Sequence, residues 1–221
     1  MLKKALATLV CGIFMLATLS ACGSTVKFDD PLFEQLIRDE LNMPTGNITA
    51  KDMETITELS YLGDELSDDA KITSIKGIEL CVNLEQLALA DHKISDITPL
   101  RNLTKLELLN LDFNNLSDIS ALSGLTNLTL LYLGDNQISD VTPLAGLHNL
   151  TLLVAYSNNI SDITPLSGLT LLDRLDLDDN DISDISVLRE LVNLNSIHLH
   201  NNNVQDWSPV DHVTGYIGGR P

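Results

Sequence analysis

The chain has 221 residues, enough for one domain of average to large size. It carries 13 Lys and Arg residues against 31 Asp and Glu residues, a formal net charge of −18. This balance argues against nucleic-acid binding and against adsorption to anionic membranes through basic residues. Because 44% of the residues are apolar, the chain is not an acidic disordered segment. Aromatic residues make up only 4%, so the core must consist mainly of Leu, Ile and Val.

The start of the chain differs from everything after it. Lys3 and Lys4 precede an uncharged, mainly apolar run from 5 to 19, which is shorter than the about 20 residues of a membrane-spanning helix. This pattern is typical of a secretory signal. We therefore expect residues 1–21 to be a signal peptide.

The run ends in the letters LSAC, followed by Gly23, and so resembles the lipobox of bacterial lipoproteins. The resemblance implies cleavage before Cys22 and a covalent lipid on its sulfur, with residues 22–27 as the lipidated Cys and a short linker. It also implies anchoring to the bacterial cell membrane on the extracytoplasmic face. An ordinary signal peptide with a chance Cys is the alternative.

Cysteine usage agrees with this interpretation. Cys11 lies in the leader and Cys22 would be acylated, which leaves only Cys81 and no internal disulfide in the mature chain. Cys81 occupies the repeat position of Leu103, which predicts a buried apolar residue rather than a nucleophile. Because the leader holds two lysines and no acidic residue, its removal takes the formal charge from −18 to −20.

The body of the chain is an internal repeat of 22 residues. The first leucine of the repeat recurs at Leu84, Leu106, Leu128, Leu150, Leu172 and Leu194. An asparagine recurs at Asn114, Asn136, Asn158, Asn180 and Asn202. One unit, residues 128–149, reads LTLLYLGDNQISDVTPLAGLHN and resembles the leucine-rich repeats of internalins. The resemblance covers roughly residues 72–213.

The repeat also has a physical interpretation. Leu131 and Leu133 alternate around Tyr132, the period of a β-strand, so each repeat adds one strand to a parallel sheet. The asparagines are expected to form a structural ladder that satisfies backbone groups of the turn and of the neighbouring repeat. Thr142 followed by Pro143 predicts an N-cap and the first residue of a short helical or 3₁₀ turn. We expect an Asp column to accept hydrogen bonds at these turns rather than to bind cations. Its members are Asp96, Asp118, Asp140, Asp162, Asp184 and Asp206.

These patterns predict an α/β solenoid: a curved parallel β-sheet with short convex 3₁₀ or helical turns and an α-helical N-terminal cap. Asp30-Pro31 starts an amphipathic helix and Thr49 can cap a second one, as in the helical cap of internalin-like proteins. Trp207 is expected to cover the C-terminal end. The expected boundaries are 28–55 for the cap, 56–213 for the repeats (an imperfect first repeat at 56–83, then six regular repeats from 84) and 214–221 for a C-terminal tail.

The concave face is the candidate ligand-binding surface, because repeat proteins use such faces for binding. Outward-facing strand positions form an apolar, aromatic patch and an Asp/His patch. The candidate residues are Leu108, Phe113, Leu130, Tyr132, Leu152, Val154, Tyr156, Asp176, Asp178, His198 and His200. Ordinary variation among repeats is the alternative explanation of the apolar patch.

The Asp/His patch offers ligands that suit zinc. Asp176, Asp178, His198 and His200 are weak metal candidates, with simple charge pairing as the alternative. We assign no cofactor apart from the lipid on Cys22.

The chain has no P-loop, no GxSxG and no HExxH motif, so we expect no catalysis. We predict a lipid-anchored surface module, similar to internalins, that recognises a protein or peptide ligand through its concave face. A glycan is a further ligand class, and the protein is expected to be monomeric and not to bind nucleic acid. The alternative is a structural or cation- and metal-scavenging envelope lipoprotein. High salt should weaken binding by charge but not binding by the aromatic patch.

Overall fold

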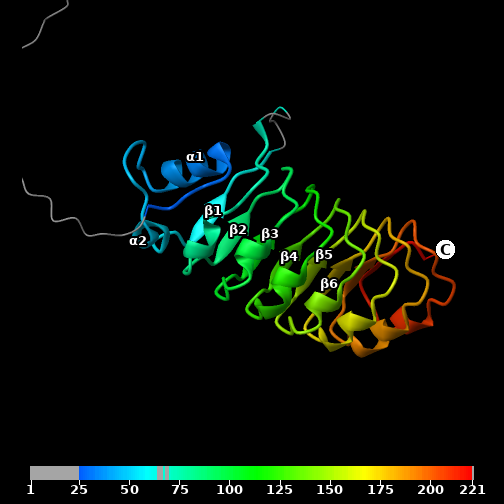
Figure 1. Ribbon diagram of the computed structural model, residues 1–221. Helices are drawn as coiled ribbons and strands as arrows, with labels where there is room; N and C mark the ends of the chain where they lie inside the picture. The colour runs from blue at the N-terminus through cyan, green and yellow to red at the C-terminus, as the bar shows by residue number, and fades with distance from the viewer. Residues whose placement is uncertain (1–24, 64–66, 68–69, 221) are drawn as a thin grey trace, which may run out of the picture.

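The computed structural model describes residues 25–63, 67 and 70–220. The leader and Cys22 therefore lie outside the described residues. Within the described part of the chain, no helix is both long and apolar enough to cross a membrane. The repeats form one elongated stack, with two helices at the N-terminal end and the C-terminus at the far end (Figure 1).

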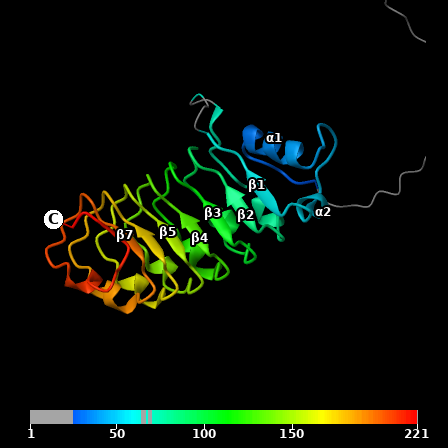
Figure 2. The ribbon, with the colours of Figure 1, turned by 180° about the vertical axis from the view of Figure 1, so that it is seen from behind.

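Eight short strands form a single open parallel sheet in chain order, as Figures 1 and 2 show from opposite sides. From β2 to β7 the register advances by one repeat at each step, so that Leu109 pairs with Leu131 and Leu131 with Leu153. The strands are β1 (Glu58–Ser60), β2 (Gln86–Ala88), β3 (Leu108–Asn110), β4 (Leu130–Tyr132), β5 (Leu152–Val154), β6 (Arg174–Asp176), β7 (Ser196–His198) and β8 (Tyr216–Gly218). The predicted solenoid with a curved parallel sheet is confirmed.

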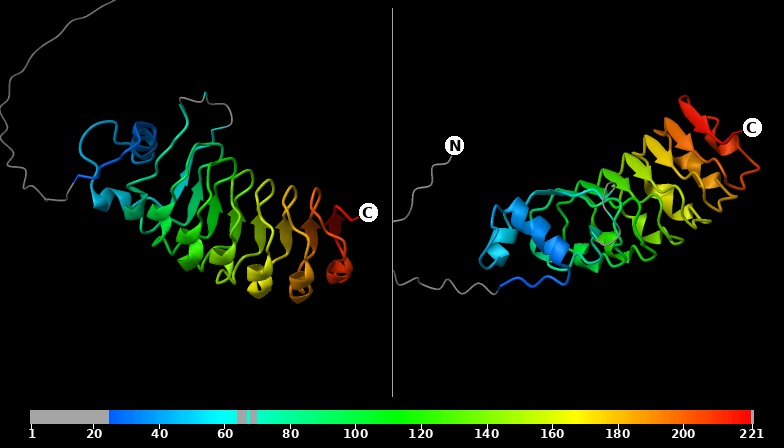
Figure 3. Two further views of the ribbon diagram at one scale, coloured as in Figure 1. Left: turned by 45° about the vertical axis from the view of Figure 1, so that its right-hand side comes forward. Right: turned by 90° about the horizontal axis from the view of Figure 1, so that it is seen from above.

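Short 3₁₀ turns line the opposite, convex side of the stack (Figure 3, left). They are η2 (Ile78–Leu80), η3 (Thr98–Leu100), η4 (Ser120–Gly124), η5 (Thr142–Leu144), η6 (Thr164–Gly168), η7 (Ser186–Glu190) and η8 (Ser208–Val210). The prediction that Thr142 is an N-cap was wrong: Val141 is the cap residue of η5, and no side chain caps the turn. Asp140 Oδ1 instead accepts the N–H of Thr142 at 2.8 Å.

The same bond recurs throughout the Asp column, which confirms its predicted structural role. Each carboxylate accepts the backbone N–H two residues on, at distances of 2.8 to 2.9 Å. A short acceptor at this place fixes the direction in which the chain enters the convex turn.

The core fills the space between the sheet and the convex turns. In the repeat 128–149 the inward side chains are fully or almost fully buried. They are Leu128, Leu131, Leu133, Ile138, Val141, Leu144 and Leu147. Cys81 lies in the same core with no exposed surface, and burial raises the pKa of its thiol to about 12. The thiol is therefore inert at neutral pH, as the sequence predicted.

The asparagine ladder is present along the stack. Asn158 donates to the carbonyls of Leu133, Ala155 and Tyr156 at 2.9 to 3.3 Å, and its Oδ1 accepts the N–H of Ile138 at 2.9 Å. The other four asparagines bridge adjacent repeats in the same way. Each side chain thus satisfies backbone groups that the turn would otherwise bury without partners.

Two helices shield the N-terminal end of the core, α1 (Pro31–Glu40) and α2 (Ala50–Met53), as expected for the cap. Asp30 caps α1 by accepting from the N–H groups of Leu32 and Phe33. Its second oxygen accepts from the backbone N–H and the hydroxyl of Thr73 at 2.7 and 2.9 Å. One carboxylate therefore joins the cap to the first repeat.

The C-terminal end differs from the expectation. Residues 214–221 were expected to be a tail, but they contain strand β8, which pairs with β7. Trp207 and Ile217 are both partly buried and both pack against the core, so Trp207 covers this end together with β8. The strand has only three residues and two glycines follow or end it, so no alternating apolar pattern reveals it in the sequence.

The ladder supports a direct test. Replacing Asn158 by Ala leaves the buried N–H of Ile138 without its acceptor, while the carbonyl of Leu133 keeps only the amide of Asn136 as a side-chain donor. We therefore expect the free energy of unfolding to fall by about 2 kcal/mol. Asn159→Ala is the matched control, because its side chain is exposed, and should change stability by less than about 0.5 kcal/mol. Urea unfolding of both variants measures the difference, and equal stabilities would contradict the role of the ladder.

Candidate ligand-binding site

The concave face is built from the outward positions of the strands. In β3, β4 and β5 the middle residue is buried while its two neighbours are partly exposed. Leu108, Leu130 and Leu152 are half-buried by their neighbours, whereas Phe113 keeps 45% of its surface exposed. The apolar patch is therefore real but is centred on aromatic residues rather than on the leucines.

A glycine lets aromatic side chains from different repeats meet. Asp112, Gly134 and Tyr156 hold the same position in three successive repeats, two residues after the end of each strand. We call such a set of equivalent positions a column. The Tyr156 ring covers the space where a side chain at Gly134 would lie, since a Cβ built there would be 2.5 Å from Cε1 of that ring. Tyr156 thereby reaches Phe113, and the two rings meet edge to face with centroids 6.2 Å apart.

Phe113 also holds an unusual backbone conformation. The third residue after each strand from β2 to β7 has a positive φ. These residues are Asp91, Phe113, Asp135, Ser157, Asp179 and Asn201. Asp and Asn tolerate this left-handed region, but a bulky aromatic residue is disfavoured there, by about 1 kcal/mol. Residues in such conformations cluster at functional sites, so Phe113 is a candidate contact residue on backbone geometry as well as on exposure.

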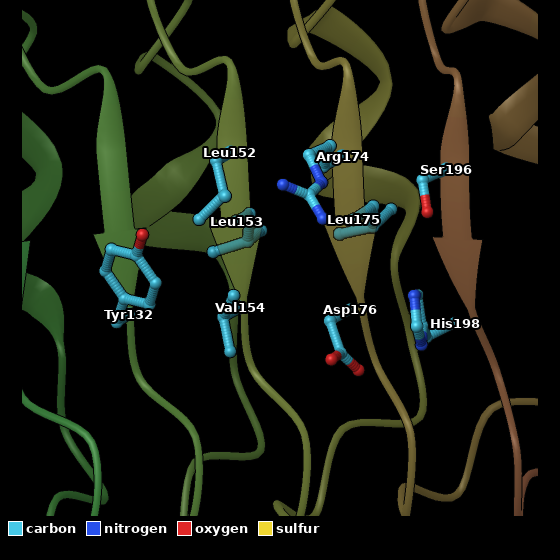
Figure 4. Close-up of a pocket in the computed structure, with 9 residues that line it drawn as sticks. All are labelled: Tyr132, Leu152, Leu153, Val154, Arg174, Leu175, Asp176, Ser196 and His198. Atoms are coloured by element: carbon cyan, nitrogen blue, oxygen red, sulfur yellow. The ribbon is translucent and has the colours of Figure 1, made fainter. Parts of the chain in front are cut away.

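A shallow cavity of about 250 Å³ lies on the concave face between β4 and β7 (Figure 4). Tyr132 and Val154 line one side, and Asp176 and His198 line the other. Its remaining lining residues are Leu152, Leu153, Arg174, Leu175 and Ser196. The cavity thus joins an apolar wall to a charged wall.

Burial changes the electrostatics of the acidic residues on this face. Burial, together with the nearby charges of Asp176 and Asp135, raises the pKa of Asp112 to about 6, although its Oδ1 accepts the N–H of Gly134 at 2.6 Å. Burial and the neighbouring Asp178 also raise the pKa of Asp176. The carboxylates of Asp112 and Asp176 are therefore poorly hydrated when they are ionised.

The Asp/His patch is a compact cluster. His200 Nδ1 lies 3.1 Å from both carboxylate oxygens of Asp178, and His198 Nδ1 lies 3.9 Å from Asp178 Oδ2. One ligand atom from each of the three side chains falls within 4.8 Å of the others. Asp176 pairs with His198 in the sheet register but is not a member of this group.

The expected site residues divide into three sets. Tyr132, Leu152, Val154, Asp176 and His198 line the cavity, whereas the remaining apolar candidates do not, namely Leu108, Leu130, Phe113 and Tyr156. Asp178 and His200 join His198 in the cluster at its C-terminal side. Arg174 and Ser196 also line the cavity but were not among the expected site residues. Both residues hold the same outward-facing repeat position as Leu152, and this shared position was the signal that could have identified them.

The raised pKa of Asp112 predicts a pH-dependent stability. A carboxyl that binds its proton more tightly in the folded state destabilises the fold once ionised, so this contribution worsens as the pH rises from about 4 to above 6. Asp112→Asn keeps the acceptor for Gly134 and removes the charge. After allowance for solvent screening, we expect it to stabilise the protein by about 1 kcal/mol at pH 7.5 and much less at pH 4.5.

Urea unfolding at the two pH values measures this gain. Asp173→Asn is the control, since it makes the same charge change at an exposed site. A gain for Asp112→Asn that is equal at both pH values, or equal to that of Asp173→Asn, would contradict the burial of an ionised Asp112.

Comparison with known proteins agrees with the geometry. A family model described as "Leucine Rich repeats (2 copies)" matches residues 104–146 and 126–170. No curated protein sequence gives a significant match. Among solved structures, the leucine-rich-repeat ectodomain of the plant membrane receptor kinase GASSHO1/SCHENGEN3 from Arabidopsis thaliana, in complex with CASPARIAN STRIP INTEGRITY FACTOR 2, is 26% identical. That match has a TM-score of 0.58 and covers 63% of this chain and 19% of the receptor chain.

Two bacterial structures are more similar. An internalin C2 from Listeria monocytogenes is 35% identical, with a TM-score of 0.66, over 86% of this chain and 92% of the other. An internalin (inlF) from the same organism is 30% identical, with a TM-score of 0.65, over 91% of this chain and 73% of the other. The chain therefore belongs to the internalin family of leucine-rich-repeat proteins.

Proposed function

We propose that this protein is a non-catalytic binding module that recognises a protein or peptide through the concave face of its repeats. The observation that carries the proposal is the aromatic group of Phe113, Tyr156 and Tyr132 on the concave face. Phe113 is exposed, the two tyrosines are partly exposed, and Tyr132 lines the cavity between β4 and β7. Exposed apolar groups of this kind mark interaction sites, and aromatic residues are enriched at protein interfaces.

Phe113 favours a functional explanation of the apolar patch over ordinary variation among repeats. Its left-handed backbone disfavours a large aromatic side chain, and its ring is 45% exposed, so it adds little to the core. Stability alone would favour Asn or Asp at this position, as in four of the five other repeats. A contact with a partner would account for a phenylalanine at this position.

The charges of the face favour a basic partner. Asp112 and Asp176 are partly buried on this face, and burial raises the pKa of both carboxyls, so each is poorly solvated when ionised. A Lys or Arg side chain of a ligand would pair with these carboxylates and could lie against Tyr132 or Tyr156. We therefore favour a partner surface that combines an apolar residue with a basic one.

The lipobox-like sequence before Cys22 supports a further part of the proposal, namely lipid anchoring on the extracytoplasmic face of a bacterial membrane. Thr25 pairs with Thr49, and the N–H of Val26 donates to the carbonyl of Ile48. The stretch from Cys22 to Thr25 therefore reaches at most about 10 Å when extended. The domain would then lie close to the membrane, which favours a partner within the cell envelope.

Substitutions in the aromatic group should weaken binding and leave folding intact. We expect Phe113→Asn and Tyr132→Ala each to lower the affinity for a captured partner by at least about tenfold, the effect of removing an interface anchor. Phe113→Asn should also leave thermal stability unchanged or higher, because Asn accepts the left-handed conformation. Affinity capture from envelope extracts supplies the partner, and titration calorimetry measures the loss.

Leu171→Ala is the matched control for this experiment. Leu171 is 48% exposed, close to the value for Phe113, but lies in the segment between η6 and β6, away from the concave face. If the control weakens binding as much as Phe113→Asn does, the concave face is not the binding surface. Binding that disappears at high salt would favour the alternative of a charge-based scavenger.

Anchoring is tested on Cys22. We expect the wild-type protein to incorporate a labelled fatty acid and to sediment with membranes, whereas Cys22→Ala should lose the label and leave the membrane fraction. Cys81→Ala is the control, because a buried thiol in the core should play no part in acylation. Unchanged labelling of Cys22→Ala would overturn the lipoprotein assignment.

A further inference from the structure

The strongest feature outside the aromatic group is the cluster of Asp178, His198 and His200 at the C-terminal end of the concave face. Two imidazoles and one carboxylate project from successive repeats and place a ligand atom each within 4.8 Å of one another. The ladder, the core and the Asp column use none of these side chains. Asp178 has one structural bond, since its Oδ1 accepts the N–H of His200 as Asp112 accepts that of Gly134, but no such bond accounts for the two histidines.

The separations suit a small tetrahedral ion. Ligand atoms about 2.1 Å from a tetrahedral zinc lie about 3.4 Å apart. His200 Nδ1 is 3.1 Å, and His198 Nδ1 3.9 Å, from an oxygen of Asp178. The ligand atoms of the two imidazoles lie within 4.8 Å of each other. Rotation of the imidazoles has to shorten that separation by no more than about 1.4 Å for a tetrahedral zinc.

Neighbouring residues hold these side chains in place. Asp178 Oδ1 accepts the backbone N–H of His200 at 2.6 Å, which fixes the carboxylate over the next repeat. Gly218 leaves room for the His200 ring, since a Cβ there would lie 2.5 Å from its Cε1. The Tyr216 ring packs against His198 with centroids 4.6 Å apart. Strand β8 thus frames the cluster, and this support for the ligands resembles the outer shell of metal sites.

We propose that Asp178, His198 and His200 form a binding site for Zn²⁺ or a similar divalent transition metal. Imidazole with carboxylate is a ligand set for zinc, whereas calcium and magnesium prefer oxygen ligands throughout. Three protein ligands leave a fourth position for water or for a donor group of a partner. The proposal does not depend on the protein-binding function.

Titration calorimetry with zinc chloride on the purified protein without a histidine tag tests the site. We expect one Zn²⁺ per chain with a dissociation constant in the micromolar range, and no heat with magnesium chloride. We expect zinc affinity to fall at least about tenfold in each of the variants His198→Ala, His200→Ala and Asp178→Asn. The loss of a residue that binds the metal directly lowers affinity more than the loss of an outer-shell contact. Zinc should raise the melting temperature of the wild type and not that of the His200→Ala variant.

His148→Ala is the matched control, because His148 is exposed on the convex side, where its Nδ1 contacts the Gly168 carbonyl. It should bind zinc like the wild type. His200 is exposed as well, so its replacement should leave the circular dichroism spectrum unchanged. No saturable zinc binding by the wild type would overturn the proposal, and so would equal binding by the wild type and all three site variants.

Discussion

Where each repeat leaves the sheet, the chain must turn in a place that water does not reach. One asparagine side chain resolves this conflict by taking three carbonyls and one N–H, and it draws these groups from two successive repeats. Because the amide must reach both repeats, their relative position is fixed to within a hydrogen-bond length. The parallel register of the strands, the stacking of the leucines and the alignment of the concave columns all follow from this constraint.

The first full repeat shows how strict the requirement is. His92 stands where the later repeats have Asn, and it meets the same demand with a ring: Nδ1 accepts the N–H of Ile72 and Nε2 lies 2.9 Å from the carbonyl of Tyr61. Burial lowers the pKa of His92, so the ring stays neutral and can offer one donor and one acceptor. The position therefore selects for hydrogen-bonding capacity rather than for one amino acid.

Periodic features could be predicted from the sequence because a residue that recurs every 22 positions has the same environment each time. The leucine core, the ladder, the Asp column and the outward faces of the strands belong to this class. Features that break the period could not be predicted. Strand β8 has no apolar alternation, and the contact between Tyr156 and Phe113 depends on the missing side chain of Gly134, which lies in a third repeat. The cavity likewise depends on how Arg174 and Ser196 lie relative to Tyr132 across four strands.

Gly134 has a wider consequence. In a parallel stack the residues of one column stand about 4.8 Å apart, so each large side chain normally screens its neighbours from one another. A column position without a side chain removes that screen and lets residues two repeats apart act as one group. A substitution at a single column position can therefore change which side chains meet on the concave face without changing the ladder or the core. In evolution, such a scaffold can change its partner one codon at a time without passing through an unfolded intermediate.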